Sequence, residues 1–343
     1  MAVGKKFMFV LCVALSVIIG IMTLSSLNSH VIAEQYRTAV RQFSMLSVQK
    51  QQENCSSVQH YKRSGTADFM RVMATLHRER RDTLAKACAE WDKRQVGNEP
   101  IGNALFSKKY KFTACPIYKS GSSTFLRSIL EMEGVNQTPM QFNGLMAEGR
   151  KRRIAALPTA EKKQEIWDQY LNVILVRSPF ERFVSAYTDK LVPTGRGYTY
   201  VFKPLSKNFR NQFISIRANV SERTAKEEHA TFEDFVNHLI RNQDGSRDHH
   251  WRSYEAWCSA CNHGYDVIMK METLSDDVRY VAELLGISPE HRNWFFPSSK
   301  PATDIHKTER FFKTVPKNLS LALYEMSKRD FDMFGYPKPN WLW

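Results

Sequence analysis

Apolar residues along this chain alternate between two spacings, and the alternation predicts an α/β fold. Residues 111–117 (KFTACPI) form a short β-leaning run, and residues 171–176 (LNVILV) form a continuous apolar run. A continuous run of that length is typical of a strand buried on both faces of a parallel sheet. Residues 265–271 (YDVIMKM) form a third run. Helical patterns separate the runs, so we predict a parallel sheet flanked by helices.

Each of these runs is followed by residues with helical spacing, in which apolar side chains return every three or four positions. After the first run, Gly134 is a natural C-cap for the helix. After the second run, Ser178 can cap a helix and Pro179 fits its first turn. Residues 274–285 and 319–334 predict further helices. The sequence therefore predicts three strand–helix units followed by a C-terminal helix.

The first hundred residues lack this order. Residues 7–27 carry no charge, and about 20 apolar residues suffice to cross a bilayer. Lys5 and Lys6 precede that stretch, so we predict a transmembrane signal anchor at 7–27, a cytosolic tail at residues 1–6 and a lumenal remainder. A cleaved signal peptide is the alternative, although its apolar region normally runs only about 7–15 residues. Either interpretation predicts a protein of the secretory pathway.

Residues 28–104, between the anchor and the first strand, are predicted to form a lumenal stem. Residues 42–60 are rich in Gln and Ser, whereas apolar residues return at near-helical spacing near 68–91. We therefore predict a helix near 68–91 that joins the stem to a globular domain at 105–343. N-glycosylation sequons, which agree with a lumenal position, occur at Asn54, Asn136, Asn219 and Asn318.

The cysteines also fit a lumenal position. Five of the six follow the anchor, so at least one of the five cannot pair within the chain. Cys258-x-x-Cys261 is weak evidence for zinc, because no second pair of ligands accompanies it. An oxidising compartment favours a disulfide instead, local or longer-range.

The formal net charge of +14 predicts an acidic partner. A lumenal position argues against nucleic acid, so anionic glycans and nucleotide cofactors remain. Residues 151–153 (KRR) and the basic region at 196–217 are candidates to hold an acidic polymer. The alternative for both is a solvated basic surface.

The candidate chemistry lies at two strand-to-helix turns. The first turn holds Lys119, Gly121 and several hydroxyl residues. A helix N-terminus gathers unpaired N–H groups and the positive end of a dipole, which suits a phosphate. Glycine lets the backbone approach such a group, hydroxyls donate to it and lysine supplies a charge. The first turn therefore predicts a phosphate site.

The second turn predicts another phosphate site and argues against a nucleoside triphosphatase. Arg177 ends the second strand and Ser185 follows on the next helix, so both could reach one phosphate. A triphosphatase would place a carboxylate near that strand end to hold magnesium. The pattern G-x-x-x-x-G-K-[ST] is also unmatched, because Lys119 precedes Gly121. The two turns together predict a ligand with two separate phosphates and no metal.

These segments resemble the sulfotransferases. Residues 115–130 resemble their 5′-phosphosulfate loop, and residues 177–191 (RSPFERFVSAYTDKL) resemble their 3′-phosphate motif. More specifically, the chain resembles Golgi carbohydrate sulfotransferases of the chondroitin 4-O and HNK-1 type. The resemblance spans about residues 80–336, with further matches at 80–88, 248–251, 258–274 and 331–336.

The resemblance implies a P-loop-like sulfotransferase fold and 3′-phosphoadenylyl sulfate (PAPS) as the donor, without a metal. Lys119 would stabilise charge on the leaving phosphate. Arg177 and Ser185 would bind the 3′-phosphate. The implied 5′-phosphosulfate site consists of Tyr118, Lys119, Ser120, Gly121, Ser122, Ser123 and Thr124. Tyr118 departs from the family pattern, which usually has proline there.

A general base for the acceptor hydroxyl is predicted at His250, because a near-neutral imidazole suits the task. His249, Asp248 or another carboxylate are alternatives. A purely structural role is also open, in which His250 packs beside Trp251.

The predicted function is that of a Golgi type II membrane enzyme that sulfates a glycosaminoglycan, at the 4-position of N-acetylgalactosamine in chondroitin. Alternative acceptors are heparan sulfate, another glycan or a protein tyrosine. A different class of function is a membrane-tethered glycan-binding relative without catalysis. The departure at Tyr118 leaves that class open, whereas the presence of both phosphate motifs argues against it.

Overall fold

A computed structural model describes residues 66–91, 101–136, 142–192, 230–242, 248–287 and 305–342. The predicted anchor, the cytosolic tail and most of the predicted stem lie outside these residues. Within the described residues, no helix is long and apolar enough to span a membrane. Residues 64–343 form one compact unit, and the fold described below belongs to it.

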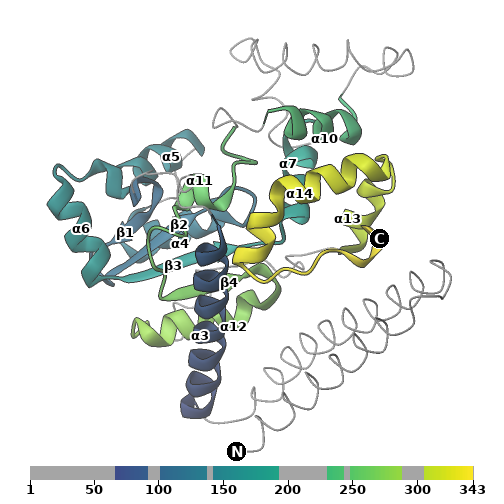
Figure 1. The fold of residues 1–343 in the computed structure, drawn as a ribbon. Coiled ribbons are helices and arrows are strands. Elements are labelled where there is room, and N and C mark those ends of the chain that lie inside the picture. The colour runs from purple at the N-terminus through teal and green to yellow at the C-terminus, as the bar shows by residue number, and fades with distance from the viewer. Residues whose placement is uncertain are drawn as a thin grey trace, which may run out of the picture. The chain divides into compact units, whose positions relative to one another are not determined.

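A four-stranded sheet forms the centre of this unit, in the order β1-β2-β3-β4 (Figure 1). The strands are β1 (Leu105–Ser107), β2 (Phe112–Pro116), β3 (Leu171–Val176) and β4 (Val267–Lys270). Strand β1 is antiparallel to β2, whereas β2, β3 and β4 are parallel. The predicted α/β fold is therefore confirmed. The sheet is parallel as predicted except at the edge strand β1, which the sequence pattern did not predict. The carboxyl ends of the three parallel strands meet at one edge, where the two candidate turns begin.

Each parallel strand leads into a helix, as the spacing of apolar residues predicts. These helices are α4 (Ser122–Met132), α7 (Pro179–Lys190) and α12 (Leu274–Leu284). Residues Val173 to Val176 of β3 are almost inaccessible to solvent, which explains the continuous apolar run. Among the described residues, the other helices of at least five residues are α3 (Thr66–Glu90), α5 (Phe142–Lys151), α6 (Ala160–Gln169), α10 (Phe232–Arg241), α11 (Tyr254–Cys258), α13 (Ile305–Phe312) and α14 (Lys317–Met333).

Helix α3, which matches the helix predicted near 68–91, packs against β4, α12 and α14 (Figure 1). Its Arg80 donates to the carbonyl of Ile268 at 2.7 Å and to the buried carboxylate of Asp277 at 2.9 Å. The compact unit begins at Ser64, so this helix belongs with the sheet. It is therefore more than the link between stem and domain that the sequence pattern suggests.

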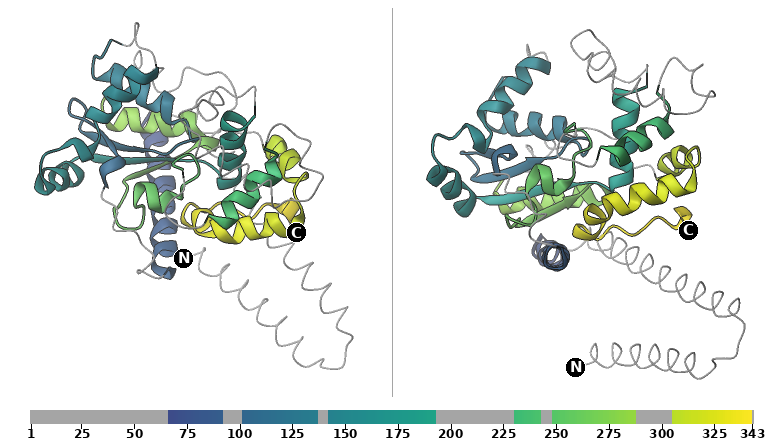
Figure 2. Two further views of the ribbon diagram at one scale, coloured as in Figure 1. Left: turned by 90° about the horizontal axis from the view of Figure 1, so that it is seen from above. Right: turned by 45° about the horizontal axis from the view of Figure 1, so that its top comes forward.

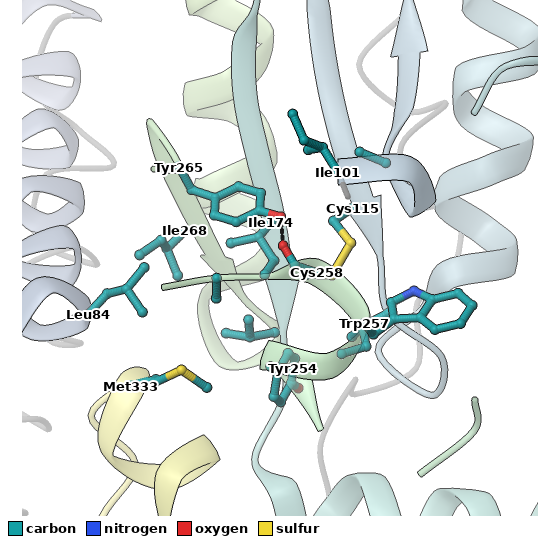
Figure 3. Close-up of a cluster of buried hydrophobic side chains, with 14 of the residues drawn as sticks. Leu84, Ile101, Cys115, Ile174, Tyr254, Trp257, Cys258, Tyr265, Ile268 and Met333 are labelled. Atoms are coloured by element: carbon teal, nitrogen blue, oxygen red, sulfur yellow. Dashed lines mark hydrogen bonds between the residues drawn. A yellow bond between two sulfur atoms is a disulfide. The ribbon is translucent and has the colours of Figure 1, made fainter. Parts of the chain in front are cut away.

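Two disulfides, Cys88–Cys261 and Cys115–Cys258, cross-link segments far apart in the chain. The prediction that Cys258-x-x-Cys261 serves disulfides is confirmed, and each of its cysteines pairs at long range. The Cys115–Cys258 bond joins β2 to α11 beside Trp257 and Tyr254 (Figure 3). It therefore holds α11 against the carboxyl end of β2, next to the first turn.

A second core lies between helices rather than on the sheet. Helix α7 contacts α13 and α14, and α10 contacts α14. Both views of Figure 2 show the yellow C-terminal helices beside the teal α7 and the green α10. Aromatic rings fill this core. Phe180 stacks on Phe312 with 4.3 Å between ring centroids, and Phe235 lies edge-on to Trp251 with 5.3 Å between centroids. Because α7 belongs to this core, its site-facing residues have a fixed position.

Candidate functional site

The first turn joins β2 to α4 through two residues in the left-handed backbone region. Lys119 has φ of 69° and Gly121 has φ of 79°. Such a conformation costs a residue with a side chain roughly 1–2 kcal/mol, and strained positions of this kind gather at functional sites. Helix α4 begins immediately afterwards, at Ser122. The turn thus leads into the N–H groups of a helix N-terminus, the arrangement that the sequence pattern predicts.

The Lys119 side chain points toward helix α7. Its Nζ lies 3.0 Å from a carboxylate oxygen of Asp189, and Lys190 Nζ lies 3.2 Å from the same oxygen. Burial lowers the pKa of Lys119, and the Asp189 carboxylate opposes that shift. Sequence reasoning missed Asp189, because it lies 70 residues from Lys119 and only the fold brings the two together.

The second turn lies directly beside the first. Arg177 Nη1 donates to the carbonyl oxygen of Lys119 at 3.3 Å, and Arg177 Nε lies 3.1 Å from the Glu181 carboxylate. Ser185 follows Glu181 by four residues on α7, and Asp189 follows Ser185 by four. Residues spaced by four share one side of a helix. Ser185 is part-buried on the side of α7 whose carboxylates hold the two cations.

Tyr254 of α11 fastens the two turns together. Its buried hydroxyl accepts from the Arg177 N–H at 2.8 Å and donates to the Arg177 carbonyl at 2.8 Å. The same hydroxyl lies 3.3 Å from Ser120 Oγ in the first turn. The cationic turns that the sequence predicts are therefore adjacent in space. No local pattern marks Tyr254, which lies 77 residues from Arg177.

Arg182 is a third residue that sequence reasoning missed. It is fully buried, although it lies on the helix of the second motif. Its Nε donates to the Tyr118 carbonyl at 3.2 Å, and its Nη2 donates to the Arg252 carbonyl at 2.6 Å. Its guanidinium also lies over the Tyr254 ring, 4.7 Å from the centroid. Arg182 thus joins the first turn to the segment that carries the candidate base.

That segment, residues 248–251, places both histidines against the first turn. The Tyr118 ring lies 4.4 Å from the His249 ring and 4.9 Å from the His250 ring, centroid to centroid. Nδ1 of His250 lies 2.5 Å from Asp248 Oδ1. Trp251 turns away from them and packs into the helical core against Phe235. Tyr118, the departure from the family pattern, is therefore the contact between the turn and the histidines.

Burial sets the protonation of this group. It lowers the pKa of His249 to about 4, and it also lowers the pKa of His250, against the opposing effect of Asp248. Burial alone would raise the pKa of Asp248, but the hydrogen bond and charge of His250 lower it to about 2. At neutral pH the carboxylate is charged and both imidazoles are neutral. Since Asp248 accepts the Nδ1 proton of His250, the Nε2 lone pair is left to accept another.

The residues Asp248, His249 and His250 have ligand atoms within 4.8 Å of one another. Across the described ranges, they are the single group of such side chains close enough to hold a metal ion. The hydrogen bond between Asp248 and His250 already occupies one oxygen and one ring nitrogen. The absence of a metal from the chemistry stays a prediction.

The remaining residues of the predicted donor site line the start of α4. Ser120 is buried, whereas Ser122 and Thr124 are part-buried and Ser123 is exposed. These residues span the turn and the first turn of α4, where the helix N–H groups begin. The turn therefore combines backbone donors, hydroxyl donors and one lysine, a set that suits an anion with several oxygens.

Comparison with known proteins identifies the class. A model of the sulfotransferase family matches residues 102–337, which include both turns and the histidine segment. The chain belongs to the sulfotransferase family. Family membership implies PAPS as the sulfate donor. No solved structure matches the chain significantly.

Curated relatives extend this finding to carbohydrates. Carbohydrate sulfotransferase 10 of Xenopus laevis is 28% identical over 285 residues, which cover 78% of this chain and 78% of the relative. Carbohydrate sulfotransferase 11 of Mus musculus is 29% identical over 283 residues, with the same coverage of each chain. Human carbohydrate sulfotransferase 10 is 24% identical over 294 residues, or 80% of each chain. The chain is homologous to carbohydrate sulfotransferases of two kinds, and this identity does not select between their acceptors.

Proposed function

We propose that this chain transfers the sulfuryl group of PAPS to the 4-hydroxyl of N-acetylgalactosamine in chondroitin. The observation that carries the proposal is that the turn after β2, the turn after β3 and the histidine segment at 248–251 lie next to one another. The two cationic turns lie side by side, and Tyr118 of the first contacts His249 and His250. The names of the relatives favour a sugar as the acceptor.

In this proposal the donor spans both turns. The first turn, from Tyr118 to Thr124, holds the 5′-phosphosulfate. Arg177 and Ser185 hold the 3′-phosphate. Lys119 and Arg177 already lie within hydrogen-bonding reach of Asp189 and Glu181, and the donor's phosphates would exchange for these carboxylates.

The transfer forms a bond from the acceptor oxygen to sulfur and breaks the bond from sulfur to the 5′-phosphate oxygen. Negative charge grows on the departing phosphate, so Lys119 and the N–H groups of the turn stabilise the transition state. The acceptor hydroxyl gives its proton to Nε2 of His250. Asp248 orients that imidazole through Nδ1 and stabilises the imidazolium that forms.

We further propose a Golgi address, with residues 7–27 as a single-pass type II anchor and the compact unit in the lumen. Two disulfides within the described residues support an oxidising compartment. The apolar stretch at 7–27 and the preceding lysines support the orientation.

The test uses the full-length chain in detergent with PAPS labelled on its sulfate. The acceptors are desulfated chondroitin, desulfated dermatan, desulfated heparan sulfate, a tyrosine peptide and an uncharged polysaccharide. We expect label on chondroitin, at the 4-position after disaccharide analysis. Label on another member of the panel instead of chondroitin would show that this other molecule is the acceptor. No label on any acceptor, together with no binding of adenosine 3′,5′-bisphosphate, would refute the proposal that this chain is an active sulfotransferase.

A further inference from the structure

The basic run at residues 151–153 splits between two environments, which its sequence does not reveal. Lys151 and Arg152 both pair with Glu148, one turn earlier on α5, at 2.6 and 3.0 Å. Arg153 turns the other way, and its guanidinium lies over the Trp257 ring, 5.9 Å from the centroid. In the part of the chain that the structure describes, no carboxylate pairs with the Arg153 side chain.

The backbone around Arg153 is held firmly to the edge of the sheet. Residue 153 forms a β-bridge with Leu105 of strand β1. On either side of it, the carbonyl of Arg152 accepts from Phe106 at 2.9 Å, and the N–H of Ile154 donates to Ala104 at 2.8 Å. The guanidinium therefore projects from a fixed point, as a binding residue does when its site is preorganised.

The buried side chain of Trp257 supports Arg153, and a second arginine lies beside the same ring. The Trp257 indole donates to the Pro116 carbonyl at 3.3 Å, and its own carbonyl accepts from Asn103 at 3.0 Å. The guanidinium of Arg252 also lies 5.9 Å from the centroid of this ring. The Arg252 backbone is fixed by the bond from Arg182. Two part-exposed guanidinium groups thus lie near the ring of one buried indole.

These residues border the candidate base. The Trp257 ring lies 5.3 Å from the Tyr118 ring and 5.9 Å from the His249 ring. A sugar whose hydroxyl reaches His250 would extend past Tyr118 and Trp257. A guanidinium suits a planar carboxylate, to which it can donate two parallel hydrogen bonds.

We propose that Arg153, with Arg252, binds a hexuronate carboxylate of the acceptor glycan next to the sulfated sugar. This inference rests on the proposed function and adds a charged subsite to it. It makes Arg153 a specificity-determining residue and leaves the donor side of the site unchanged. Arg152, paired with Glu148, has no part in it.

The experiment measures binding and transfer separately, with the full-length chain in detergent. Binding of unsulfated chondroitin is measured with adenosine 3′,5′-bisphosphate present, and transfer is measured with labelled PAPS. Carboxyl-reduced chondroitin is the second acceptor. The variants are Arg153→Ala and the matched control Arg152→Ala, the same residue type one position earlier.

We expect Arg153→Ala to weaken binding of unsulfated chondroitin and raise its KM about 10-fold, as for loss of a charged hydrogen bond. Arg152→Ala should change either value less than about 2-fold on the same grounds. Carboxyl reduction should weaken binding to the wild type by a similar factor. Arg153→Ala should then cause no additional loss. The KM for PAPS should stay constant throughout.

Equal binding of native and carboxyl-reduced chondroitin would overturn the subsite, as would equal effects of the two arginine variants. An arm with 6-O-sulfated, carboxyl-reduced chondroitin tests a sulfate ester as the anion. If the wild type binds this polymer as tightly as native chondroitin and Arg153→Ala abolishes that gain, the anion bound by Arg153 is a sulfate ester and not a carboxylate. If label reaches no acceptor while carboxylate-dependent binding persists, the proposed transfer fails and the subsite stands.

Discussion

The turn after β2 and the turn after β3 both present a cation at the same edge of the sheet, but they are built differently. The first turn contains two left-handed residues, Lys119 and Gly121, and leads into helix N–H groups. The second has no left-handed residue and bends through Ser178 and Pro179. Its cation, Arg177, is braced by Glu181 and Tyr254. One turn thus offers backbone donors, and the other offers a braced side chain.

This difference indicates a division of work. Backbone donors around a lysine suit charge that develops during transfer, and Tyr118 of that turn also contacts the histidines. A braced arginine in the turn before a rigid helix suits a phosphate whose charge does not change. We therefore expect changes in the first turn to lower kcat and changes in the second turn to raise the KM for PAPS.

The largest effects are expected from Lys119→Ala and Arg177→Ala, each of which should abolish transfer at low PAPS concentration. Lys119→Ala should lower kcat roughly 100- to 1,000-fold, as for loss of one transition-state donor. Arg177→Ala should raise the KM for PAPS roughly 100-fold, with a smaller loss of kcat at saturation. Steady-state kinetics at varied PAPS separates the two.

The control for this pair is Lys313→Ala, which removes an exposed lysine paired with Glu309 on α13. It should leave both constants unchanged. If both site variants changed kcat and the KM for PAPS in the same proportion, or if either kept full activity, the proposed position of PAPS across the two turns would be wrong.

The next largest effect is expected from changes in the histidine segment, residues 248–251, because its histidines contact Tyr118 of the first turn. Burial lowers the pKa of His250, so the neutral base persists below pH 6.5 and kcat should fall only as the pH drops through that lowered pKa. Asp248→Asn removes a carboxylate that raises the pKa of His250. The acid limb of kcat should therefore move to lower pH, and kcat at neutral pH should fall roughly 10-fold.

An acid limb that moves to higher pH in Asp248→Asn would contradict this assignment. Lys190 and Lys119 act on the same imidazole and lower its pKa. Lys190→Ala should therefore raise the pKa of His250 and move the acid limb of kcat to higher pH, opposite to the shift expected for Asp248→Asn.

A smaller effect is expected at the link between the turns. Tyr254→Phe removes the hydroxyl that bonds both backbone groups of Arg177 and contacts Ser120. The unpaired N–H should cost about 1–3 kcal/mol of stability, and the displaced arginine should raise the KM for PAPS several-fold, roughly 5-fold. Thermal unfolding and donor kinetics measure the two.

Tyr265→Phe is the matched control for this link. Tyr265 is also buried, and its hydroxyl donates to the Cys258 carbonyl at 2.7 Å rather than to Arg177 or Ser120 (Figure 3). It should lower stability without a change in the KM for PAPS. A rise in that KM for both variants would mean that stability alone explains the effect.

The smallest effect is expected from Ser185→Ala, which deletes one neutral donor from the second turn's side of the site. The KM for PAPS should rise roughly 2- to 3-fold, and kcat should stay constant. Thr188→Ala on the same helix is the control, because its hydroxyl donates to the Val184 carbonyl at 2.9 Å. A fall in kcat for Ser185→Ala would assign Ser185 to the chemistry instead.

Much of this site follows from local sequence. The short apolar runs at 111–117, 171–176 and 265–271 contain strands β2, β3 and β4, and each turn is set by the residues between a run and its helix. The cations at Lys119 and Arg177 lie at those turns because the chain itself places them there. The resemblance to sulfotransferases also needs only sequence, and the family match agrees with it.

The tertiary structure alone decides which distant groups complete the site. Asp189 holds Lys119 across 70 residues of chain, Tyr254 holds Arg177 across 77, and Arg182 contacts the Tyr118 carbonyl across 64. Apolar periodicity constrains neighbours within a strand or a helical turn, so it predicts elements and their order. The position of one element on another depends on sheet register, disulfide pairing and core packing, which no local pattern specifies.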